Sequence, residues 1–211
     1  MARGGTRRGQ PIELGGFGLT PEELTGPVTS ASLFGNDAPL ELEVGSGTGT
    51  LIVTESLARP RVNFVGIEFV RRYWRYAADR LRRNGCENAR IVLAEAVTLI
   101  RDYLADDTLS AVHIYFPDPW PKTRHRARRF VQPSHIELIA TKMRRGARLQ
   151  IVTDHDKYFE QIQKVVHASS LRVVDFNTPA AADSEEMVGS NFERKYRREG
   201  RAFHAIAAER V

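Results

Sequence analysis

Cysteine is almost absent from this 211-residue chain, in which Cys86 stands alone. A single cysteine excludes an internal disulfide framework and a cysteine-rich zinc site. The six histidines are scattered, with no pair at the spacing typical of metal ligands. We therefore expect no metal.

Long apolar runs are also missing. No uninterrupted apolar stretch approaches the roughly 20 residues that a membrane span requires. Residues 1–10 are rich in Arg and Gly and lack the apolar centre of a secretory signal. We expect no membrane partner and a cytoplasmic location.

The remaining composition suits a folded domain. Hydrophobic residues make up 42% of the chain and aromatic residues 9%, which is enough to build a core and is unlike a disordered chain. The length fits one α/β domain. The net charge of +5 favours a polyanionic partner.

Residues 1–38 show no sustained apolar period and are rich in Gly, Thr, Pro and Arg. We expect them to form a basic arm that is flexible or loosely docked, before a single domain over residues 39–211. In that domain, apolar patterns of strand and helix period alternate. Strands are predicted at residues 40–44, 62–67, 89–94, 109–116, 146–153, 171–176 and 202–208, and helices at 50–57, 70–81, 96–104, from Pro133 and after Asp154.

Strands that alternate with helices predict an α/β fold with a mainly parallel sheet and helices on both faces. Sheets of this kind bind ligands at the carboxyl ends of their strands. Asp154 follows the fifth strand and is predicted to cap the next helix. Residues 177–200, between the last two strands, are polar.

A glycine loop follows the first predicted strand and contains Gly45, Gly47 and Gly49. A dinucleotide-binding loop would have its third glycine one place later and would face a pyrophosphate. Glu43, just before the loop, would repel a pyrophosphate but suits an ammonium group. This favours S-adenosylmethionine as the cofactor, and the alternative is an ordinary glycine-rich turn.

Two further carboxylates end neighbouring strands. Glu68 ends the second strand and can accept hydrogen bonds from ribose hydroxyls, which applies equally to NAD; the alternative is a solvated strand-end glutamate. Glu95 follows the third strand and can accept from an adenine amino group. Its alternative is a helix-start glutamate favoured by the helix dipole.

Three prolines lie within five residues at the end of the fourth strand, in the segment 116–122. They stiffen the backbone that carries Asp118, Trp120 and Lys122, which indicates a preorganised site rather than a flexible surface loop. The alternative is a decorated structural turn. A basic run follows at once and can neutralise phosphates, the alternative being a solvated face; it contains Lys122, Arg124, His125, Arg126, Arg128 and Arg129.

The segment Phe116–Lys122 with the basic run resembles the signature of bacterial tRNA (guanine-N7)-methyltransferases. The resemblance extends from Leu42 to about Phe203 and includes residues 43–45, 66–68, 153–154 and 191–193. Two positions depart from the family pattern: Glu95 stands where Asp is usual, and Ser190 where Thr is usual. Both departures keep the chemical group.

The resemblance implies a Rossmann-like class I methyltransferase fold, with a seven-stranded, mostly parallel sheet and an antiparallel last strand. It implies methyl transfer from S-adenosylmethionine to N7 of a guanosine at position 46 in the variable loop of tRNA, by a monomer or homodimer. The cofactor site would hold Glu43, Gly45, Gly47, Gly49, Glu68, Glu95 and Asp118. The guanosine would meet Lys122, Asp154, Ser190, Asn191, Phe192 and Glu193, and the RNA would lie along Arg124, His125, Arg126, Arg128 and Arg129.

Guanine N7 has an exposed lone pair, so methyl transfer to N7 needs no general base to remove a proton. Our hypothesis is that Asp118 orients the guanine and stabilises the cation that develops. Asp118, Asp154 and Glu193 would accept from the N–H donors of guanine. Trp120 either stacks on a base or packs beneath its loop, and both possibilities stay open.

Three rival functions remain at this point. The chain could methylate another RNA base or a protein, it could bind RNA without catalysis, or it could be an NAD dehydrogenase. The glycine loop and Asp118 argue against a non-catalytic module. The missing glycine at the sixth loop position argues against NAD.

Overall fold

Eight strands form one sheet in the computed structural model, which describes residues 14–211. The strands are β1 (Gly18–Leu19), β2 (Leu40–Val44), β3 (Asn63–Glu68), β4 (Ala89–Leu93), β5 (Leu109–Tyr115), β6 (Met143–Thr153), β7 (Arg172–Val174) and β8 (His204–Glu209). Their order across the sheet is β1-β4-β3-β2-β5-β6-β8-β7. All neighbouring pairs are parallel except those that β8 makes with β6 and β7.

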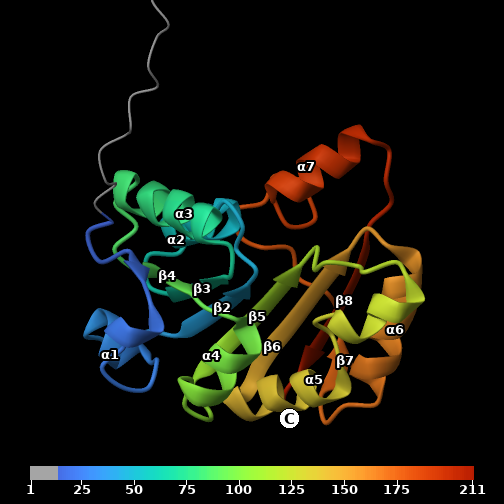
Figure 1. Cartoon of the computed structure of the whole chain (residues 1–211), viewed down its shortest axis with the longest axis horizontal. Coiled ribbons are helices and arrows are strands. Elements are labelled where there is room, and N and C mark those ends of the chain that lie inside the picture. Colours follow the sequence, from blue (N-terminus) through green and yellow to red (C-terminus); the bar gives the residue numbers. More distant parts are fainter. Residues whose placement is uncertain (1–13) are drawn as a thin grey trace, which may run out of the picture.

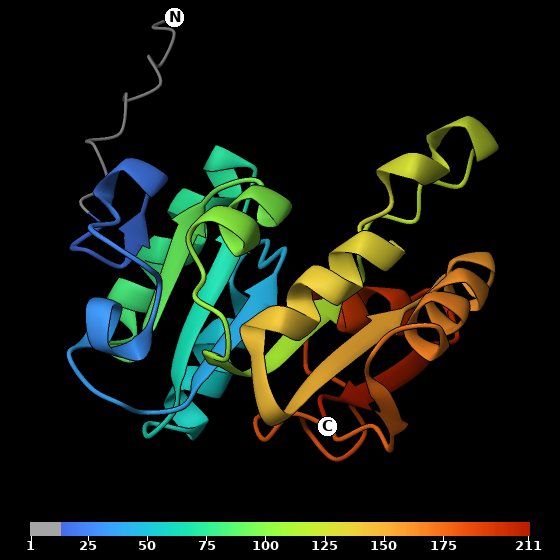
Figure 2. The same ribbon diagram turned by 90° about the horizontal axis from the view of Figure 1, so that it is seen from below.

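Helices cover both faces of this sheet (Figures 1 and 2). They are α1 (Ser30–Phe34), α2 (Thr50–Ala58), α3 (Arg71–Arg83), α4 (Ala96–Asp102), α5 (Pro133–Lys142), α6 (Asp156–His167) and α7 (Asn191–Arg198), with 3-10 turns η1 (Pro21–Glu23) and η2 (Thr123–Arg128). Helices α2 and α3 pack on one face, and α4, α5 and α6 on the other. Helix α7 lies across the edge toward which β5 and β6 point (Figure 1).

The central strands are buried on both faces, which accounts for their nearly continuous apolar sequence. Leu42, Val65 and Val112 of β2, β3 and β5 have no exposed surface, and Ile151 of β6 is 1% exposed. The parallel pairing brings the carboxyl ends of these strands to one edge. The predicted α/β class and the antiparallel last strand are therefore confirmed.

An eighth strand was not expected. Strand β1 pairs with β4 through Gly18 and Leu19 and lies at the edge of the sheet. A Cβ atom on Gly18 would lie 2.8 Å from the Cβ of Ala78 in α3, so only glycine lets this backbone pack so closely.

Residues 14–38 are docked on the domain, contrary to the expectation of a loosely held arm. Phe17 is 7% exposed, Val28 is fully buried, and the N–H of Val28 donates to the carbonyl of Tyr103 at 2.7 Å. These contacts are long-range, and residues 1–38 have no sustained apolar period from which they could be predicted. The remainder of the expected arm, residues 1–13, lies outside the described residues.

Within residues 14–211, no helix combines the length and apolar character needed to cross a membrane. The same residues contain no cluster of three or more His, Cys, Asp or Glu side chains arranged to hold a metal ion.

Candidate active site

The glycine loop forms the carboxyl end of β2 and leads into α2. Gly45, Gly47 and Gly49 have φ angles of 79°, 53° and 72°, in the left-handed region that favours glycine. A Cβ on Gly49 would lie 2.7 Å from the Cβ of Ala77, whereas a Cβ on Gly45 would meet no atom of residues 14–211 within 4 Å. The loop is therefore tight against α3 and open at Gly45, where a ligand can approach the backbone.

Glu43 carries an unpaired acceptor directly beneath this loop. Its Oε2 atom is buried and has no hydrogen-bond partner among the described residues, and the same is true of Ser46 Oγ. Burial raises the pKa of the Glu43 carboxyl to about 7. Buried polar groups are normally hydrogen-bonded, so an unpaired carboxylate oxygen here indicates a place for a donor that a ligand supplies.

Glu68 holds the loop in shape. One carboxylate oxygen accepts from the N–H of Gly47 at 2.8 Å, and the other from the N–H of Val70 at 2.7 Å. Glu68 is 7% exposed, so it is not the solvated strand-end residue that the sequence left open. Each oxygen retains a second lone pair. Phe69 beside it is 72% exposed, an apolar surface that the sequence analysis missed.

Glu95 ends β4 and caps α4. Its carboxylate accepts from the N–H groups of Val97 and Thr98, at 3.0 and 2.7 Å, and from the Thr98 hydroxyl. This is the helix-start alternative that the sequence offered. The cap occupies both oxygens, and the residue stays at the edge where Glu43 and Glu68 also end their strands.

The first turn of α7 covers the glycine loop. Asn191 Nδ2 donates to Thr48 Oγ1 at 3.2 Å, and Phe192 lies beside Gly47. Under this cover is a cavity of about 20 Å³, lined by Glu43, Gly45, Ser46, Thr48, Thr50, Leu51, Tyr115, Phe116, Ser190, Asn191 and Phe192. The predicted segment 190–192 and the predicted loop therefore meet, as the two halves of one site.

Asp118 lies at the carboxyl end of β5, in the proline-bounded loop. Two bulky residues flank it in the left-handed region, Phe116 with φ 52° and Trp120 with φ 39°. Such backbone strain persists only where the surroundings impose it, and it clusters at functional sites. The Asp118 side chain is exposed and does not line the cavity beneath α7. The strained loop presents it to solvent at the same edge.

Most of the basic run is exposed on η2, which stands away from the body of the molecule in Figure 2. Lys122, Arg124, Arg126 and Arg128 are exposed and His125 is half-buried. The guanidinium of Arg128 lies 5.1 Å from the ring centre of Trp120, and His125 meets that ring edge-on at 5.7 Å. Trp120 therefore packs against two side chains of the basic run.

Arg129 is not on the RNA-facing surface, and its assignment as an RNA contact was wrong. It is 2% exposed. Its guanidinium donates to the carbonyl of Pro119 and to Oε1 of Gln161, each at 2.7 Å, and lies over the ring of Tyr158 at 4.6 Å. It braces the proline-bounded loop from below. Position in a basic run does not reveal which member turns inward.

Asp154 does not cap α6, as the sequence suggested. His155 takes that place, with Nδ1 accepting from the N–H of Tyr158 at 3.3 Å. Asp154 instead forms an ion pair with Arg201, at 2.5 Å, and that guanidinium also lies over the ring of Tyr196. One carboxylate oxygen predicted to meet guanosine is thus held by the loop before β8.

Glu193 is fully buried and acts within the protein. Its carboxylate accepts from the N–H groups of Met187, Val188 and Gly189 at 2.6, 2.8 and 2.9 Å, and from Arg197 at 2.7 Å. Burial alone would raise the pKa of Glu193, but these donors hold it below its usual value. The structure therefore contradicts a direct contact between Glu193 and guanosine. Ser190 caps α7 by accepting from the N–H of Glu193.

An aromatic cluster joins the proline-bounded loop to α7, and the sequence analysis missed it. The ring of Phe116 lies 6.5 Å from Phe192, 5.7 Å from Tyr196 and 5.6 Å from Phe203. These residues are spread over almost 90 positions of sequence, so no local pattern could reveal them. The cluster fixes α7 against the strained loop that carries Asp118.

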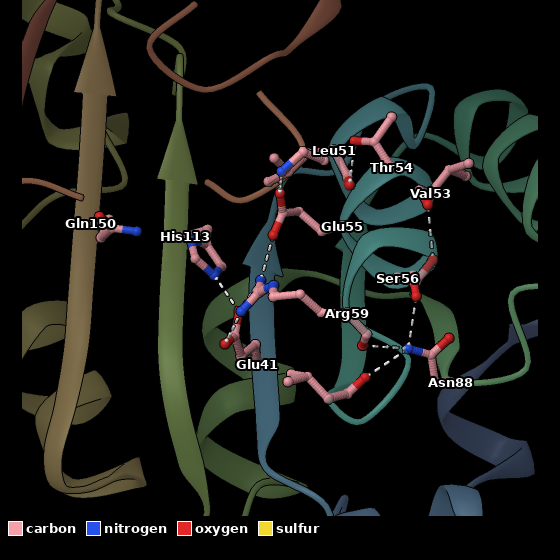
Figure 3. Close-up of polar contacts among 12 residues, drawn as sticks. Glu41, Leu51, Val53, Thr54, Glu55, Ser56, Arg59, Asn88, His113 and Gln150 are labelled. Carbon is pink, nitrogen blue, oxygen red and sulfur yellow. Dashed lines mark hydrogen bonds and ion pairs between the residues drawn. The ribbon is translucent and has the colours of Figure 1, made fainter. Parts of the chain in front are cut away.

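A buried polar network supports the site from beneath (Figure 3). Glu41 accepts from Arg59 at 2.7 and 2.8 Å and contacts His113 Nε2 at 2.9 Å. Burial would raise the pKa of Glu41, but His113 and Arg59 lower it to about 2.

The same network anchors the segment that leads into α7. Arg59 pairs with Glu55 at 2.6 Å, and Glu55 accepts from the N–H of Ala181, also at 2.6 Å. Gln150 accepts from the N–H of Asn177. Strands β2, β5 and β6 are thereby tied to the covering segment.

The chain matches the model of a protein family described as "putative methyltransferase" over residues 37–206. A tRNA (guanine-N(7)-)-methyltransferase of Rhodopirellula baltica is 38% identical over 95% of this chain and 77% of its own length. Proteins of the same description from Nocardia farcinica and Bordetella pertussis are 37% and 39% identical over 75% and 69% of the chain. This chain spans 59% and 57% of the lengths of those two.

Solved structures of methyltransferases share the fold. An antibiotic-related methyltransferase superposes with a TM-score of 0.63 at 17% identity, over 88% of this chain and 96% of its own. A SAM-dependent methyltransferase from Aquifex aeolicus gives 0.55 at 13% identity, over 82% of each chain. At these identities the likeness bears on the fold alone.

Proposed function

The chain belongs to this methyltransferase family, and from that premise we propose that it transfers a methyl group from S-adenosylmethionine to N7 of a guanosine in tRNA. One observation carries the proposal. The carboxyl edge of the sheet brings together an unpaired buried carboxylate under a glycine loop, a strained loop with an exposed carboxylate, and an exposed basic run.

The residues at this edge fit S-adenosylmethionine. Glu43 offers a buried acceptor to which no group of residues 14–211 donates, which suits the α-ammonium group, and the open space at Gly45 admits a ligand close to the backbone. Glu68 retains lone pairs for ribose hydroxyls, and exposed Phe69 offers an apolar surface beside it. When bound, the cofactor supplies a methyl group activated by a sulfonium.

Binding requires α7 to shift. A cavity of about 20 Å³ holds roughly one water molecule, far below the roughly 300–1,000 Å³ of small-ligand sites. Among residues 14–211, one hydrogen bond, from Asn191 to Thr48, and the packing of Phe192 beside Gly47 close it directly over the loop. We infer that the first turn of α7 opens for the cofactor and closes behind it to exclude water.

Guanine N7 has a lone pair and no proton, so the protein removes no proton before transfer. Its task is to align the base and to stabilise the cation that forms, and alignment alone can contribute roughly 7–11 kcal/mol. Asp118 is the exposed carboxylate placed for this, accepting from the guanine N–H donors and balancing the new charge. Arg129 and the aromatic cluster hold its loop in place.

The exposed basic side chains of η2 would grip the RNA backbone. Lys122, Arg124 and Arg126 are exposed, on a segment that stands away from the body of the molecule (Figure 2). Salt-sensitive binding follows from contacts of this kind. Within tRNA, we propose position 46 of the variable loop as the target, because the chain resembles the bacterial tRNA (guanine-N7)-methyltransferases.

The test is to incubate the protein with unmodified tRNA and cofactor labelled in its methyl group, then digest the RNA and separate the nucleosides. The proposal predicts label in 7-methylguanosine. Label in another nucleoside would overturn the N7 assignment. Tight cofactor binding without any labelled RNA would favour a protein substrate or a non-catalytic role.

A further inference from the structure

A second cavity lies beside the proposed site, between α3 and α7. It holds about 380 Å³ and is lined by Thr48, Arg72, Tyr73, Tyr76 and Asn191. We name it the α3 groove. Its size falls within the roughly 300–1,000 Å³ of small-ligand sites, and Figure 1 shows both helices at the same edge of the molecule.

The sequence of α3 places one aromatic and basic face toward this groove. Trp74, Ala77, Ala78 and Leu81 are buried against the sheet. Arg72, Tyr73 and Tyr76 lie on the other side, at the spacing that brings side chains together on a helix.

That outer face of α3 exposes an aromatic ring and positive charge. Tyr76 is 50% exposed, and the guanidinium of Arg72 lies 4.5 Å from the ring centre of Tyr73 and donates to its hydroxyl at 2.6 Å. No carboxylate of residues 14–211 forms an ion pair with Arg72 or Arg75. Later in the same helix, Arg82 and Arg83 both pair with Asp79.

The α3 groove adjoins the cavity beneath α7. Thr48 and Asn191 line both spaces, and a hydrogen bond joins these two side chains. A polymer whose target base meets the cofactor at the first cavity therefore has a neighbouring nucleotide within reach of the α3 groove.

We propose that the α3 groove binds a nucleotide next to the target guanosine, with its base stacked on Tyr76 and Tyr73 and its phosphate on Arg72. This rests on the proposed function for the identity of the RNA. Aromatic rings and unpaired arginines are the groups that bind single-stranded nucleic acid without regard to sequence. The described residues that line the groove include no carboxylate, so they present no negative charge to repel a phosphate.

Four variants test this on an unmodified tRNA transcript, with the RNA Kd measured at several salt concentrations. Tyr76→Ala should weaken RNA binding about tenfold, because stacking on one aromatic side chain is lost. Tyr76→Phe keeps the ring and should stay within about twofold. Arg72→Gln should lower the slope of log Kd against log salt by about one. Arg83→Gln removes the same charge from the same helix at a paired position and is the matched control, with little change in slope.

Calorimetry with S-adenosylmethionine on each variant should give unchanged cofactor affinity, which shows that the fold and the first cavity are intact. If Tyr76→Ala binds RNA as tightly as the wild type, the groove is not an RNA site, and a protein partner becomes the better hypothesis. Should the wild type label an atom other than N7, the proposed function would fail, and the Kd series would still decide on the groove.

Discussion

Replacing Glu43 with Gln removes the charge of the carboxylate that lies beneath the glycine loop. The carboxylate has one buried oxygen without a partner in the described part of the chain, and burial raises its pKa to about 7 from an ordinary value of 4.5. The amide keeps the shape and removes the charge. We expect Glu43→Gln to stabilise the protein without cofactor and to weaken cofactor binding.

The direction and size of the change in stability follow from proton linkage. A folded-state pKa above the unfolded value means that the folded protein keeps a proton that the unfolded chain has lost. Stability from this group therefore falls as pH rises from about 4.5 to about 7. A rise of this size corresponds to roughly 3 kcal/mol. At pH 8 the variant should gain about 2 kcal/mol, since its buried amide is still not fully paired.

Two assays check this. Urea unfolding at pH 5 and pH 8 should show the gain at pH 8 and little at pH 5. Calorimetry should show that wild-type affinity for S-adenosylmethionine falls about tenfold from pH 8 to pH 6, as Glu43 takes up its proton, while the variant binds weakly at both. Glu87→Gln, an exposed carboxylate, should match the wild type throughout. Equal cofactor affinity in wild type and Glu43→Gln at pH 8 would refute the ammonium contact.

Other substitutions probe the loop and its supports. Asp118→Ala should lower kcat by more than tenfold, at least ~1.4 kcal/mol of barrier, with RNA and cofactor Kd unchanged; turnover within tenfold would remove its role. Arg129→Gln should lower the free energy of unfolding by about 1–3 kcal/mol and leave the salt dependence of RNA binding as it is. Arg126→Gln should reduce the slope of log Kd for RNA against log salt by about one and leave Tm unchanged. Glu193→Gln should raise KM for RNA and speed hydrogen exchange at residues 187–189, because the Glu193 carboxylate accepts from their N–H groups and so holds the turn before α7; unchanged exchange there would contradict this role.

Local sequence was enough to predict most of the sheet. The β2 strand was placed at its observed limits because its buried residues and its glycine loop are adjacent in sequence. The same holds for the start of α5 at Pro133, whose fixed φ suits a first helical turn. The location of the site at the carboxyl edge of the sheet could be predicted from the parallel topology. That topology depends on the order of strands and helices and not on individual side chains.

Side-chain partners could not be predicted in the same way. Glu193, Arg129 and Asp154 are polar residues in motifs, and each is held by groups distant in space or by backbone N–H donors. Whether a carboxylate meets a ligand or an arginine depends on which loop folds over it, and no spacing encodes that. The edge strand β1 was not predicted because a strand of two residues is too short to show an apolar period.

Position and atom can be tested together with a tRNA ligated from two pieces, so that only position 46 carries 7-deazaguanosine in place of guanosine. This substitution replaces N7 with a carbon that has no lone pair. We predict that the all-guanosine transcript accepts labelled methyl and that the substituted transcript accepts none. Equal labelling of both transcripts would contradict methyl transfer to N7 of that nucleotide.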